Sequence, residues 1–478
     1  MADTCTLHIL HTNDVHSNFS NMPQIASCLR QNRQRWEAQG ERVLTVDIGD
    51  HVDRMSLKTE ATWGRANVGV LNRSGYQYVT IGNNEGITFP KEKLDALYEH
   101  ADFTVVAGNL IEPASGQTPQ WAVPYAVHHW PDFRVGILGV TIPFVPFYRM
   151  MGWDLREPLP LIREQVAMLR PQVDVIVLLS HLGYQADCQL AREVDGLDVI
   201  LGGHTHHILE HGERIGRTLI AQAGRYGELV GHVRLTWDAA AKQVSSLSAE
   251  LFRTNDYQPE PELDDYLRRE TLAAETLLDR PAVSLSTDLD IGWTNETPFG
   301  SVLAASLRKW TGAEVGLANG GLLLTTLKHG PVSYKDLLTC VPHPINPCAV
   351  TLTGEQLLSV LKRAVQPEMV QRELRGYGFR GNQIGWMGVD GLRVWYRPGK
   401  QPDIERVEVN GEPLDLGRSY RVGTVDMFMF SRLFPELADG GEIRFYLPEL
   451  LRDILAVTLG DDVLVRAGFE PRWLPVTI

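Results

Sequence analysis

Five short apolar segments, far apart along the chain, each run directly into acidic, amide or imidazole side chains. In the first, the apolar residues Leu7, Ile9 and Leu10 lead to Asp14 and His16. Such a run predicts a β-strand, and the carboxyl ends of strands are where α/β folds build their sites. Asp14 and His16 lie two residues apart, so on an extended backbone they would share one face.

Four further apolar segments end in the same way. The segments are residues 43–48, 78–81, 173–179 and 199–201, and the side chains that follow them are Asp50, Asn83, Asn84, His181, His204 and His206. Any one of these endings is an ordinary turn in most proteins, since Asp, Asn and Gly commonly begin turns. Five such endings in order, all with nitrogen or oxygen donors, favour a shared metal site.

Seven of these side chains carry the donor atoms of the predicted site. They are Asp14, His16, Asp50, Asn83, His181, His204 and His206. Carboxylate, amide and imidazole donors suit Mn, Zn, Fe or Co. Two divalent cations about 3.5–4 Å apart share a carboxylate and use about seven or eight ligands, which is more than one ion needs. We therefore predict two divalent metal ions, with Asp50 as the shared ligand.

Two such cations lower the pKa of a water molecule held between them to about 7 and take up charge on a phosphoryl oxygen. The predicted reaction is the hydrolysis of a phosphoester by a hydroxide that bridges the two metals. We expect Asp50 and His181 to act in catalysis as well as in metal binding.

Composition limits the partners. The net charge of −14 argues against a nucleic acid or an anionic membrane. The five cysteines show no CxxC spacing, which indicates reduced thiols in a cytoplasmic protein. The start of the chain has no basic segment followed by an apolar one, and no apolar stretch approaches the length of a membrane span. We expect a cytoplasmic protein with a small-molecule substrate, and the sequence leaves the oligomeric state open.

The 478 residues can build more than one core, and the two halves of the chain differ in character. Strands and helices alternate in the first half, whereas the second half has an α+β pattern. Residues 259–280 are charged and helix-forming, which is typical of a linker helix, although a surface helix of one domain has the same composition. We predict a metal domain over residues 1–252, a linker helix over 253–283 and a substrate-binding domain over 284–478.

The order of these motifs resembles a known family. The DVH, GD, GNNE, SH and GHTH endings match the calcineurin-like metallophosphoesterases. In the second half, residues 296–300 (ETPFG), 318–321 (ANGG), 333–338 (SYKDLL) and 350–357 (VTLTGEQL) resemble the C-terminal domain of the 5′-nucleotidases. The chain is thus similar to the bacterial 5′-nucleotidase, UDP-sugar hydrolase and 2′,3′-cyclic phosphodiesterase family over nearly its whole length.

The resemblance implies an α/β fold with a four-layer α/β/β/α metal domain and an α+β C-terminal domain. It implies that one metal binds Asp14, His16, Asp50 and His206, and that the other binds Asp50, Asn83, His181 and His204. In the family, the C-terminal domain supplies the nucleoside pocket and rotates relative to the metal domain to close on substrate.

One departure from the family lies in the third motif. The family has a His there that stabilises the transition state and an Asp that orients it, whereas this chain has Asn84 and Ile87. Asn84 offers a neutral hydrogen bond only, and losing a charged donor typically costs about 2.7–4 kcal/mol of transition-state stabilisation. We therefore expect Asn84 to be a weakened catalytic donor. His51 could substitute, although a structural role for it is the simpler interpretation.

The substrate domain departs as well. The family's Arg after the NGG turn is Leu324 here, an Arg before the ETPFG segment is Asn295, and an aromatic residue is His343. Leu cannot replace the bidentate recognition of phosphate by Arg. We expect substrate to bind at Asn319, Gly320, Gly321, His343 and Phe428. An aromatic clamp could be rebuilt from Phe428, Phe430, Tyr377, Phe379 or Trp386.

The sequence therefore favours metal-dependent hydrolysis of a nucleotide or a related phosphomonoester. Two alternatives stay open at this point. One is hydrolysis of a cyclic nucleotide or of a nucleotide-sugar diphosphate. The other is a metal-loaded, nucleotide-binding protein with reduced catalysis.

Overall fold

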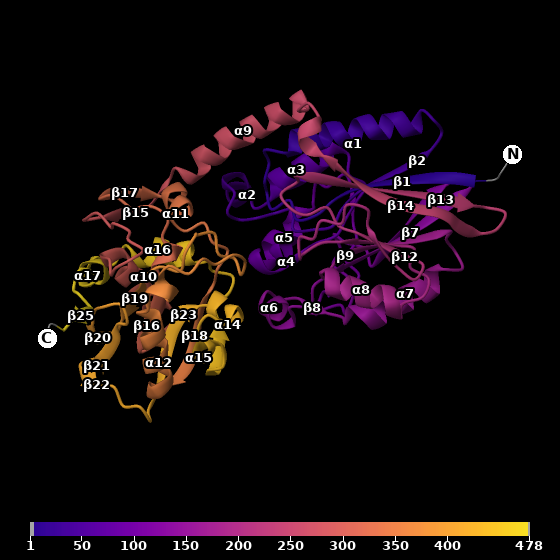
Figure 1. Cartoon of the computed structure of the whole chain (residues 1–478). Coiled ribbons are helices and arrows are strands. Elements are labelled where there is room, and N and C mark those ends of the chain that lie inside the picture. The colour runs from indigo at the N-terminus through magenta and orange to yellow at the C-terminus, as the bar shows by residue number, and fades with distance from the viewer. Residues whose placement is uncertain (1–3, 477–478) are drawn as a thin grey trace. The chain divides into compact units, whose positions relative to one another are not determined.

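The computed structural model describes residues 4–476, and the chain forms two compact units, Met1–Ala274 and Glu275–Ile478 (Figure 1). Helix α9 (Pro261–Leu278) spans the boundary between these units. The predicted division into residues 1–252, 253–283 and 284–478 concerns independently folding domains and stays a prediction.

The first unit contains two six-stranded sheets. The first sheet has the order β14-β13-β1-β2-β3-β4, and the second has the order β11-β12-β10-β9-β7-β6. In the first sheet β1 is parallel to β2 and β2 to β3, and in the second sheet β9 is parallel to both β7 and β10. The carboxyl ends of these parallel strands therefore lie at a common edge of each sheet.

The elements of the first unit have the following bounds. The first sheet comprises β1 (Thr4–Thr12), β2 (Arg42–Asp47), β3 (Tyr78–Val79), β4 (Thr104–Val105), β13 (Leu229–Asp238) and β14 (Gln243–Arg253). The second comprises β6 (Tyr125–Trp130), β7 (Phe133–Thr141), β9 (Val175–His181), β10 (Val199–Gly202), β11 (Glu213–Ile215) and β12 (Thr218–Ala221), and β5 (Leu110–Ile111) pairs with β8 (Asp154–Leu155). The helices are α1 (Met22–Glu37), α2 (Leu57–Thr62), α3 (Arg65–Ser74), α4 (Asn83–Thr88), α5 (Lys91–Leu97), α6 (Val145–Met150), α7 (Pro158–Leu169), α8 (Tyr184–Glu193) and the 3₁₀ turn η1 (Thr254–Asp256).

Apolar side chains from both sheets form the central core of the first unit. Leu7, Ile9 and Val46 of the first sheet join Val177 and Leu201 of the second in one buried cluster. A separate cluster packs the other face of the second sheet against α7 and α8, while α1 and α3 lie over the first sheet. The order helix, sheet, sheet, helix confirms the predicted four-layer α/β/β/α architecture.

The second unit is built from a five-stranded and a four-stranded sheet with helices around them. The five-stranded sheet comprises β16 (Val315–Asn319), β18 (Pro347–Thr353), β19 (Met387–Asp390), β23 (Ser419–Val425) and β24 (Gly441–Phe445). The four-stranded sheet comprises β20 (Leu392–Arg397), β21 (Asp403–Val409), β22 (Glu412–Pro413) and β25 (Trp473–Pro475), and β15 (Pro281–Leu285) pairs with β17 (Gly330–Ser333). The helices are α10 (Pro298–Thr311), the 3₁₀ turn η2 (Gly320–Leu322), α11 (Tyr334–Cys340), α12 (Gly354–Ala364), α13 (Pro367–Val370), α14 (Met427–Ser431), α15 (Pro435–Ala438), α16 (Leu451–Thr458) and α17 (Asp462–Ala467).

Some elements differ from the sequence-based expectation. Strand β9 begins at Val175 and includes His181, so this ligand candidate is the last residue of the strand and not the first after it. Strand β14 was not predicted, because it lacks the apolar run on which the other predictions rest. It is an edge strand with largely exposed side chains, and it pairs with β13. Within residues 4–476, no helix combines the length and the apolar character needed to cross a membrane.

His11 in β1 is a buried histidine without hydrogen-bond partners at either ring nitrogen. Its strand neighbour is Gly231, where a Cβ atom would lie 2.0 Å from His11 Nε2, so the glycine makes room for the ring. Burial lowers the pKa of His11 from 6.5 to about 3, with a smaller contribution from His232. Below pH 6.5 His11 therefore becomes protonated in the unfolded chain but stays neutral in the folded protein. The free energy of unfolding must fall as the pH decreases toward 3.

We expect the variant His11→Gln to lose less stability on acidification than the wild type, because glutamine does not titrate. Between about pH 7.5 and about pH 5 the difference in the loss should be about 2 kcal/mol. Urea unfolding followed by tryptophan fluorescence at both pH values measures it. The exposed His129→Gln serves as the matched control and should behave as the wild type. Equal losses in His11→Gln and the wild type would contradict the prediction.

Candidate metal centre

The five predicted strand ends converge in the first unit. β1, β2 and β3 of the first sheet and β9 and β10 of the second each deliver polar side chains at their carboxyl ends. Two groups of three donors lie within 4.8 Å of one another: Asp14, His16 and His206 form one, and Asp14, Asp50 and His181 form the other. Residues almost 200 positions apart in the sequence thus meet at one centre.

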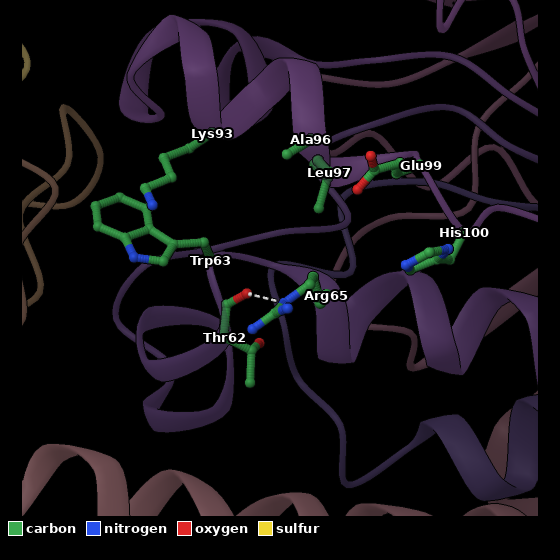
Figure 2. A pocket seen from close by; sticks show the side chains of 8 residues that line it. All are labelled: Thr62, Trp63, Arg65, Lys93, Ala96, Leu97, Glu99 and His100. Atoms are coloured by element: carbon green, nitrogen blue, oxygen red, sulfur yellow. Dashed lines mark hydrogen bonds between the residues drawn. The ribbon is translucent and has the colours of Figure 1, made fainter.

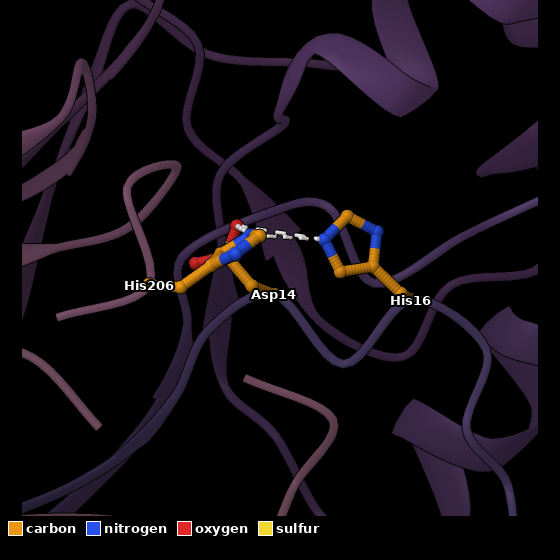
Figure 3. Close-up of side chains that lie close together, drawn as sticks. All are labelled: Asp14, His16 and His206. Atoms are coloured by element: carbon orange, nitrogen blue, oxygen red, sulfur yellow. Dashed lines mark hydrogen bonds and ion pairs between the residues drawn. The ribbon is translucent and has the colours of Figure 1, made fainter. Parts of the chain in front are cut away.

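Asp14 lies centrally in this centre (Figure 3). Its Oδ1 is 3.4 Å from His206 Nε2, 3.9 Å from His16 Nε2 and 4.0 Å from His181 Nε2. The Asp14 carboxylate also accepts the backbone N–H of His204 at 3.0 Å. One buried carboxylate therefore contacts elements of both sheets.

Asp50 occupies a second central position. Its Oδ1 is 3.4 Å from His181 Nε2, and its Oδ2 is 3.9 Å from His16 Nε2. The two donor groups share Asp14, whereas the sequence predicts Asp50 as the shared ligand. Asp50 also reaches a histidine of each group, so both carboxylates are placed to contact two cations.

Asn83 and His204 complete the predicted set on one side of the centre. His204 Nδ1 donates to Asn83 Oδ1 at 2.9 Å, and the His204 ring lies edge-on to His181 with ring centroids 5.4 Å apart. All seven side chains predicted as ligands are therefore neighbours in the structure. Their assignment as metal ligands stays a proposal.

Unusual backbone conformations place these side chains. Asp14, His16, Asp50, His204 and His206 all have positive φ angles, between 48° and 70°. Non-glycine residues rarely adopt this left-handed region, and when they do they cluster at functional sites. The loops hold one another in this arrangement, because the N–H of Asp14 donates to Gly49 O at 3.0 Å and that of His16 to Asp50 O at 2.9 Å.

Two glycines permit the close approach of the β2 and β3 loops. A Cβ atom on Gly49 would lie 2.3 Å from Gly82 N, and one on Gly82 would lie 2.0 Å from Asp50 Oδ1. Any larger residue at either position would push Asp50 away from His181. These two glycines of the GD and GNNE motifs are therefore required by the site.

The charges of the centre call for a cation. Burial alone would raise the pKa of Asp14 and Asp50, but the neighbouring imidazoles, chiefly His206 and His181 respectively, hold both pKa values below the ordinary range. Burial would lower the pKa of His181, yet Asp50 and Asp14 raise it to about 10. Burial lowers the pKa of His204 to about 4 and also lowers that of His16. His181 therefore carries a proton that a divalent cation would displace, since ionised carboxylates and neutral imidazoles are the protonation states in which these groups bind metal.

One unpartnered nitrogen shows directly that the residues fit a metal. His181 Nδ1 donates to Ile48 O at 2.7 Å, which leaves Nε2 with the lone pair when the ring is neutral. That Nε2 is buried and has no hydrogen-bond partner, although it faces the two carboxylates. A buried polar atom without a partner is costly. A divalent cation would satisfy it.

Asn84 lies inside the centre and not on its surface. Its Nδ2 donates to Val52 O at 2.9 Å and to His16 Nδ1 at 3.0 Å. Both amide N–H groups are thus engaged within the protein, and the side chain is buried. Asn84 is placed to orient His16, and its predicted role as a donor to substrate stays a prediction.

His51 is enclosed in the protein. Its Nδ1 lies 3.3 Å from Asn67 Nδ2, and its Nε2 is buried without a hydrogen-bond partner. Burial lowers its pKa to about 3, so the ring is neutral. This surrounding favours a structural role for His51.

Glu85 and Asn13 belong to the centre but were given no role by the sequence analysis. The Glu85 carboxylate accepts the backbone N–H groups of Gly82, Asp50 and Val52 at 2.8–3.1 Å, and thereby joins the β2 and β3 loops. Asn13 Nδ2 donates to Asp14 Oδ2 at 2.8 Å. Glu85 lies in the GNNE motif and Asn13 directly precedes the DVH motif, so their adjacency to the predicted ligands was the available signal.

In the second unit, four of the five predicted substrate residues contact the segment 379–386. Asn319 Nδ2 donates to Ile384 O, and the N–H of Gly321 donates to the same oxygen. His343 is fully buried between Leu322 O and the N–H of Arg380, with its ring stacked on Phe379. Gly320 donates its N–H to Trp386 O.

The fifth residue, Phe428, is separate from this group. It is fully buried against Phe434, with ring centroids 5.0 Å apart. Among the alternative clamp residues, Tyr377 is 50% exposed and Phe430 46% exposed, whereas Phe379 is buried. Among these clamp candidates, the most exposed rings are therefore those of Tyr377 and Phe430.

A surface cavity of about 200 Å³ lies elsewhere in the first unit (Figure 2). Trp63, Arg65, Lys93 and His100 are among the residues that line it. Lys93 Nζ lies 5.2 Å from the centre of the Trp63 ring. None of the predicted metal ligands contributes to this cavity, so the two features are distinct.

Comparisons with known proteins agree with the two-part organisation. Residues 7–207 match the calcineurin-like phosphoesterase family, and residues 277–432 match the 5′-nucleotidase C-terminal domain. The chain is 40% identical over 457 residues to YunD of Bacillus subtilis (strain 168), an uncharacterised metallophosphoesterase, covering 94% of this chain and 98% of that protein.

More distant proteins share the same organisation. Human 5′-nucleotidase is 22% identical over 523 residues, which cover 93% of this chain and 85% of the human protein. The NAD nucleotidase of Haemophilus influenzae has a similar structure, with a TM-score of 0.70 at 16% identity, and the match covers 99% of this chain and 100% of that one. This structural likeness concerns the fold.

The double variant Asn84→His/Ile87→Asp tests whether a missing charged donor limits the reaction. We expect turnover of p-nitrophenyl phosphate with Mn²⁺ to rise by up to about 10², because an oriented imidazolium stabilises developing negative charge better than a neutral amide. Steady-state kinetics measures the change. Ile87→Asp alone is the control, and elemental analysis must show the same metal content in all variants. An unchanged or lower turnover at equal metal content would contradict the expectation.

Proposed function

Because the chain belongs to the calcineurin-like metallophosphoesterases that carry a 5′-nucleotidase C-terminal domain, and is thus a hydrolase of ester bonds, we propose that it hydrolyses nucleotides or related phosphomonoesters with two divalent cations. In this reaction water adds to phosphorus and the P–O ester bond breaks. The products are inorganic phosphate and an alcohol, whose oxygen receives a proton.

The arrangement of Asp14, Asp50 and His181 is the observation that carries this proposal. Two buried, ionised carboxylates face His181 Nε2, which offers a lone pair to a cation when the ring is neutral. We assign Asp14, His16, Asp50 and His206 to one cation and Asp50, Asn83, His181 and His204 to the other. Asp14, which lies close to three of the histidines, is a further candidate for contact with both.

Bound divalent cations would activate water and take up charge on the phosphoryl oxygens. The protein's own residues hold the geometry. Glu85 fixes the β2 and β3 loops through three backbone N–H groups, and Asn84 fixes the ring plane of His16. Ile48 O holds the Nδ1 proton of His181, so that its Nε2 points toward the carboxylates.

We propose a nucleotide as the substrate class because the relatives are named 5′-nucleotidases and the second unit exposes two aromatic rings. Tyr377 and Phe430 are exposed, and Phe430 is stacked on Phe445 with ring centroids 6.0 Å apart. Stacking of a base on an aromatic ring is worth about 1–3 kcal/mol. A cytoplasmic location stays a prediction, and the five cysteines are free thiols.

A second candidate function is the binding of a nucleotide with reduced catalysis. The engagement of both Asn84 N–H groups with Val52 and His16 favours it, since no donor then replaces the family's catalytic His at this position. Measurable hydrolysis of p-nitrophenyl phosphate by the wild type, abolished by removal of the metals, would exclude this candidate.

We expect hydrolysis of p-nitrophenyl phosphate to require Mn²⁺ or a similar cation and to fall at least about 10³-fold in Asp50→Asn. The amide keeps the shape of the carboxylate but removes the negative charge that faces His181 and the cations. Phosphate release and elemental analysis, before and after treatment with a chelator, measure activity and metal content together. Asp102→Asn changes an exposed acid and should leave both unchanged. Full activity after complete metal removal would refute the proposed function.

The variants Tyr377→Ala and Phe430→Ala test the nucleotide assignment. If either ring stacks on the base, its loss should raise the KM for AMP about 5- to 100-fold and change the KM for p-nitrophenyl phosphate much less. Phe469→Ala, which removes an aromatic ring of similar exposure, is the matched control. Equal KM values for AMP in both variants and the control would remove these two residues from the substrate site.

A further inference from the structure

A turn over residues 223–227 lies directly beside the metal centre and is tied to it by hydrogen bonds. The N–H of Tyr226 donates to Asp14 O at 2.8 Å, and Tyr226 O accepts from the side chains of Asn18 and Asn21 at 3.1 and 3.0 Å. Asn13 adds two more bonds, because its Nδ2 donates to Gly224 O at 2.7 Å and its Oδ1 accepts from Ala223 at 3.0 Å. The turn is therefore held in place relative to Asp14.

Tyr226 adopts a conformation that is unfavourable for a bulky residue. Its φ angle is +61°, in the left-handed region where aromatic residues are rare. This conformation brings its ring against His16, with ring centroids 5.9 Å apart at 65°. The strained backbone thus places an aromatic side chain next to a predicted metal ligand.

Arg225 extends from the same turn and stacks on Tyr226. Its guanidinium carbon lies 4.6 Å from the centre of the Tyr226 ring, and the side chain is exposed. Among residues 4–476, no carboxylate forms an ion pair with Arg225. A stacked guanidinium keeps its in-plane N–H groups free for a planar anion.

An unpaired arginine in this position is notable because the chain carries a net charge of −14. An anionic substrate is repelled by such a protein as a whole and needs local positive charge near the reacting group. Asn84 is neutral and engaged within the centre, and Leu324 and Asn295 stand where the family has arginines. The Arg225 guanidinium supplies positive charge beside Tyr226, whose ring in turn lies against His16.

We propose that Arg225, seated on Tyr226, binds a second anionic group of the substrate, so that the enzyme prefers substrates whose cleaved phosphate is joined to a second phosphate by an anhydride bond over simple phosphomonoesters. This inference rests on the proposed function, since the metal centre would hold the phosphate that is cleaved. A nucleoside diphosphate has the required chemistry: water adds to its terminal phosphorus, the P–O–P anhydride bond breaks, and the inner phosphate, bound to Arg225, leaves as the nucleoside monophosphate while inorganic phosphate is released.

A comparison of ADP with AMP isolates the second anionic group, because the two share every other part. We measure kcat/KM for both with Mn²⁺, by initial rates of phosphate release, in the wild type, Arg225→Ala, Arg225→Lys and Tyr226→Leu. The ratio of the ADP value to the AMP value should fall about tenfold in Arg225→Ala, because a charge-assisted hydrogen bond to phosphate is lost. Arg225→Lys should restore part of the ratio, and Tyr226→Leu should lower it.

Arg217→Ala is the matched control, since Arg217 is also exposed and lies away from the turn. A ratio that stays at the wild-type value in Arg225→Ala, or that falls equally in Arg217→Ala, would overturn the proposed subsite. So would an equal loss for ADP and AMP, which would assign Arg225 to the cleaved phosphate instead.

Failure of the proposed function is distinguishable from failure of this inference. If the Mn²⁺-loaded wild type hydrolyses neither nucleotide, calorimetric titration with ADP and AMP replaces the kinetic ratio. Tighter binding of ADP by the wild type, lost in Arg225→Ala, would support the subsite in a protein that does not catalyse. Equal affinities for ADP and AMP in the wild type would overturn it.

Discussion

The structure of the first unit depends on two buried carboxylates, Asp14 and Asp50, which lie where the two sheets meet. Both carboxylates face His16 and His181. Burial of an ionised group is very unfavourable unless a partner of opposite charge neutralises it. The imidazoles of His16, His181 and His206 approach the two carboxylates but leave His181 Nε2 without a hydrogen bond. The strand ends therefore bring together carboxylates and imidazoles that would fit a divalent cation. In the family of metallophosphoesterases this cation also performs the chemistry.

The loops around these carboxylates show how the chain tolerates such a concentration of charge. Five of the seven predicted ligands adopt left-handed backbone conformations, and backbone hydrogen bonds between neighbouring loops hold them there. Glu85 collects three N–H groups, and the glycines at 49 and 82 let the loops touch. Rigidity of this kind fixes the distances between donors before any cation binds, so that little reorganisation accompanies binding. The apolar core between the two sheets offsets the free-energy cost of the strained backbone. The same core determines where the strands end.

The sequence was informative where a local pattern determines the geometry. The five apolar runs predicted strands, and the polar side chains that follow these runs come together at one centre. The orientation of a side chain within a crowded centre has no such local signal. The sequence predicts Asn84 as a catalytic donor, whereas its amide donates to Val52 O and to His16 Nδ1. His343 likewise reads as a replacement for an aromatic clamp, but it is enclosed between Leu322 and Arg380, which lie 21 and 37 residues away. Arg225 belongs to none of the recognised motifs. Its proposed role in binding the substrate follows only from the residues that lie near it in the structure.

The positions of Asn84 and Arg225 together suggest where the enzyme obtains positive charge for its substrate. In the family pattern an imidazolium follows β3 and arginines come from the second domain, whereas this chain has Asn84, Leu324 and Asn295 at those places. The structure instead presents a guanidinium on the β12–β13 turn, held against Tyr226 and joined through Tyr226 N–H to Asp14. In the proposed cleavage of a nucleoside diphosphate, a charge at this position would act on the inner phosphate, which is part of the leaving group. Under the proposed function, the cationic side chains that this chain lacks bear on the rate as well as on the choice of substrate, whereas the seven proposed metal ligands are retained.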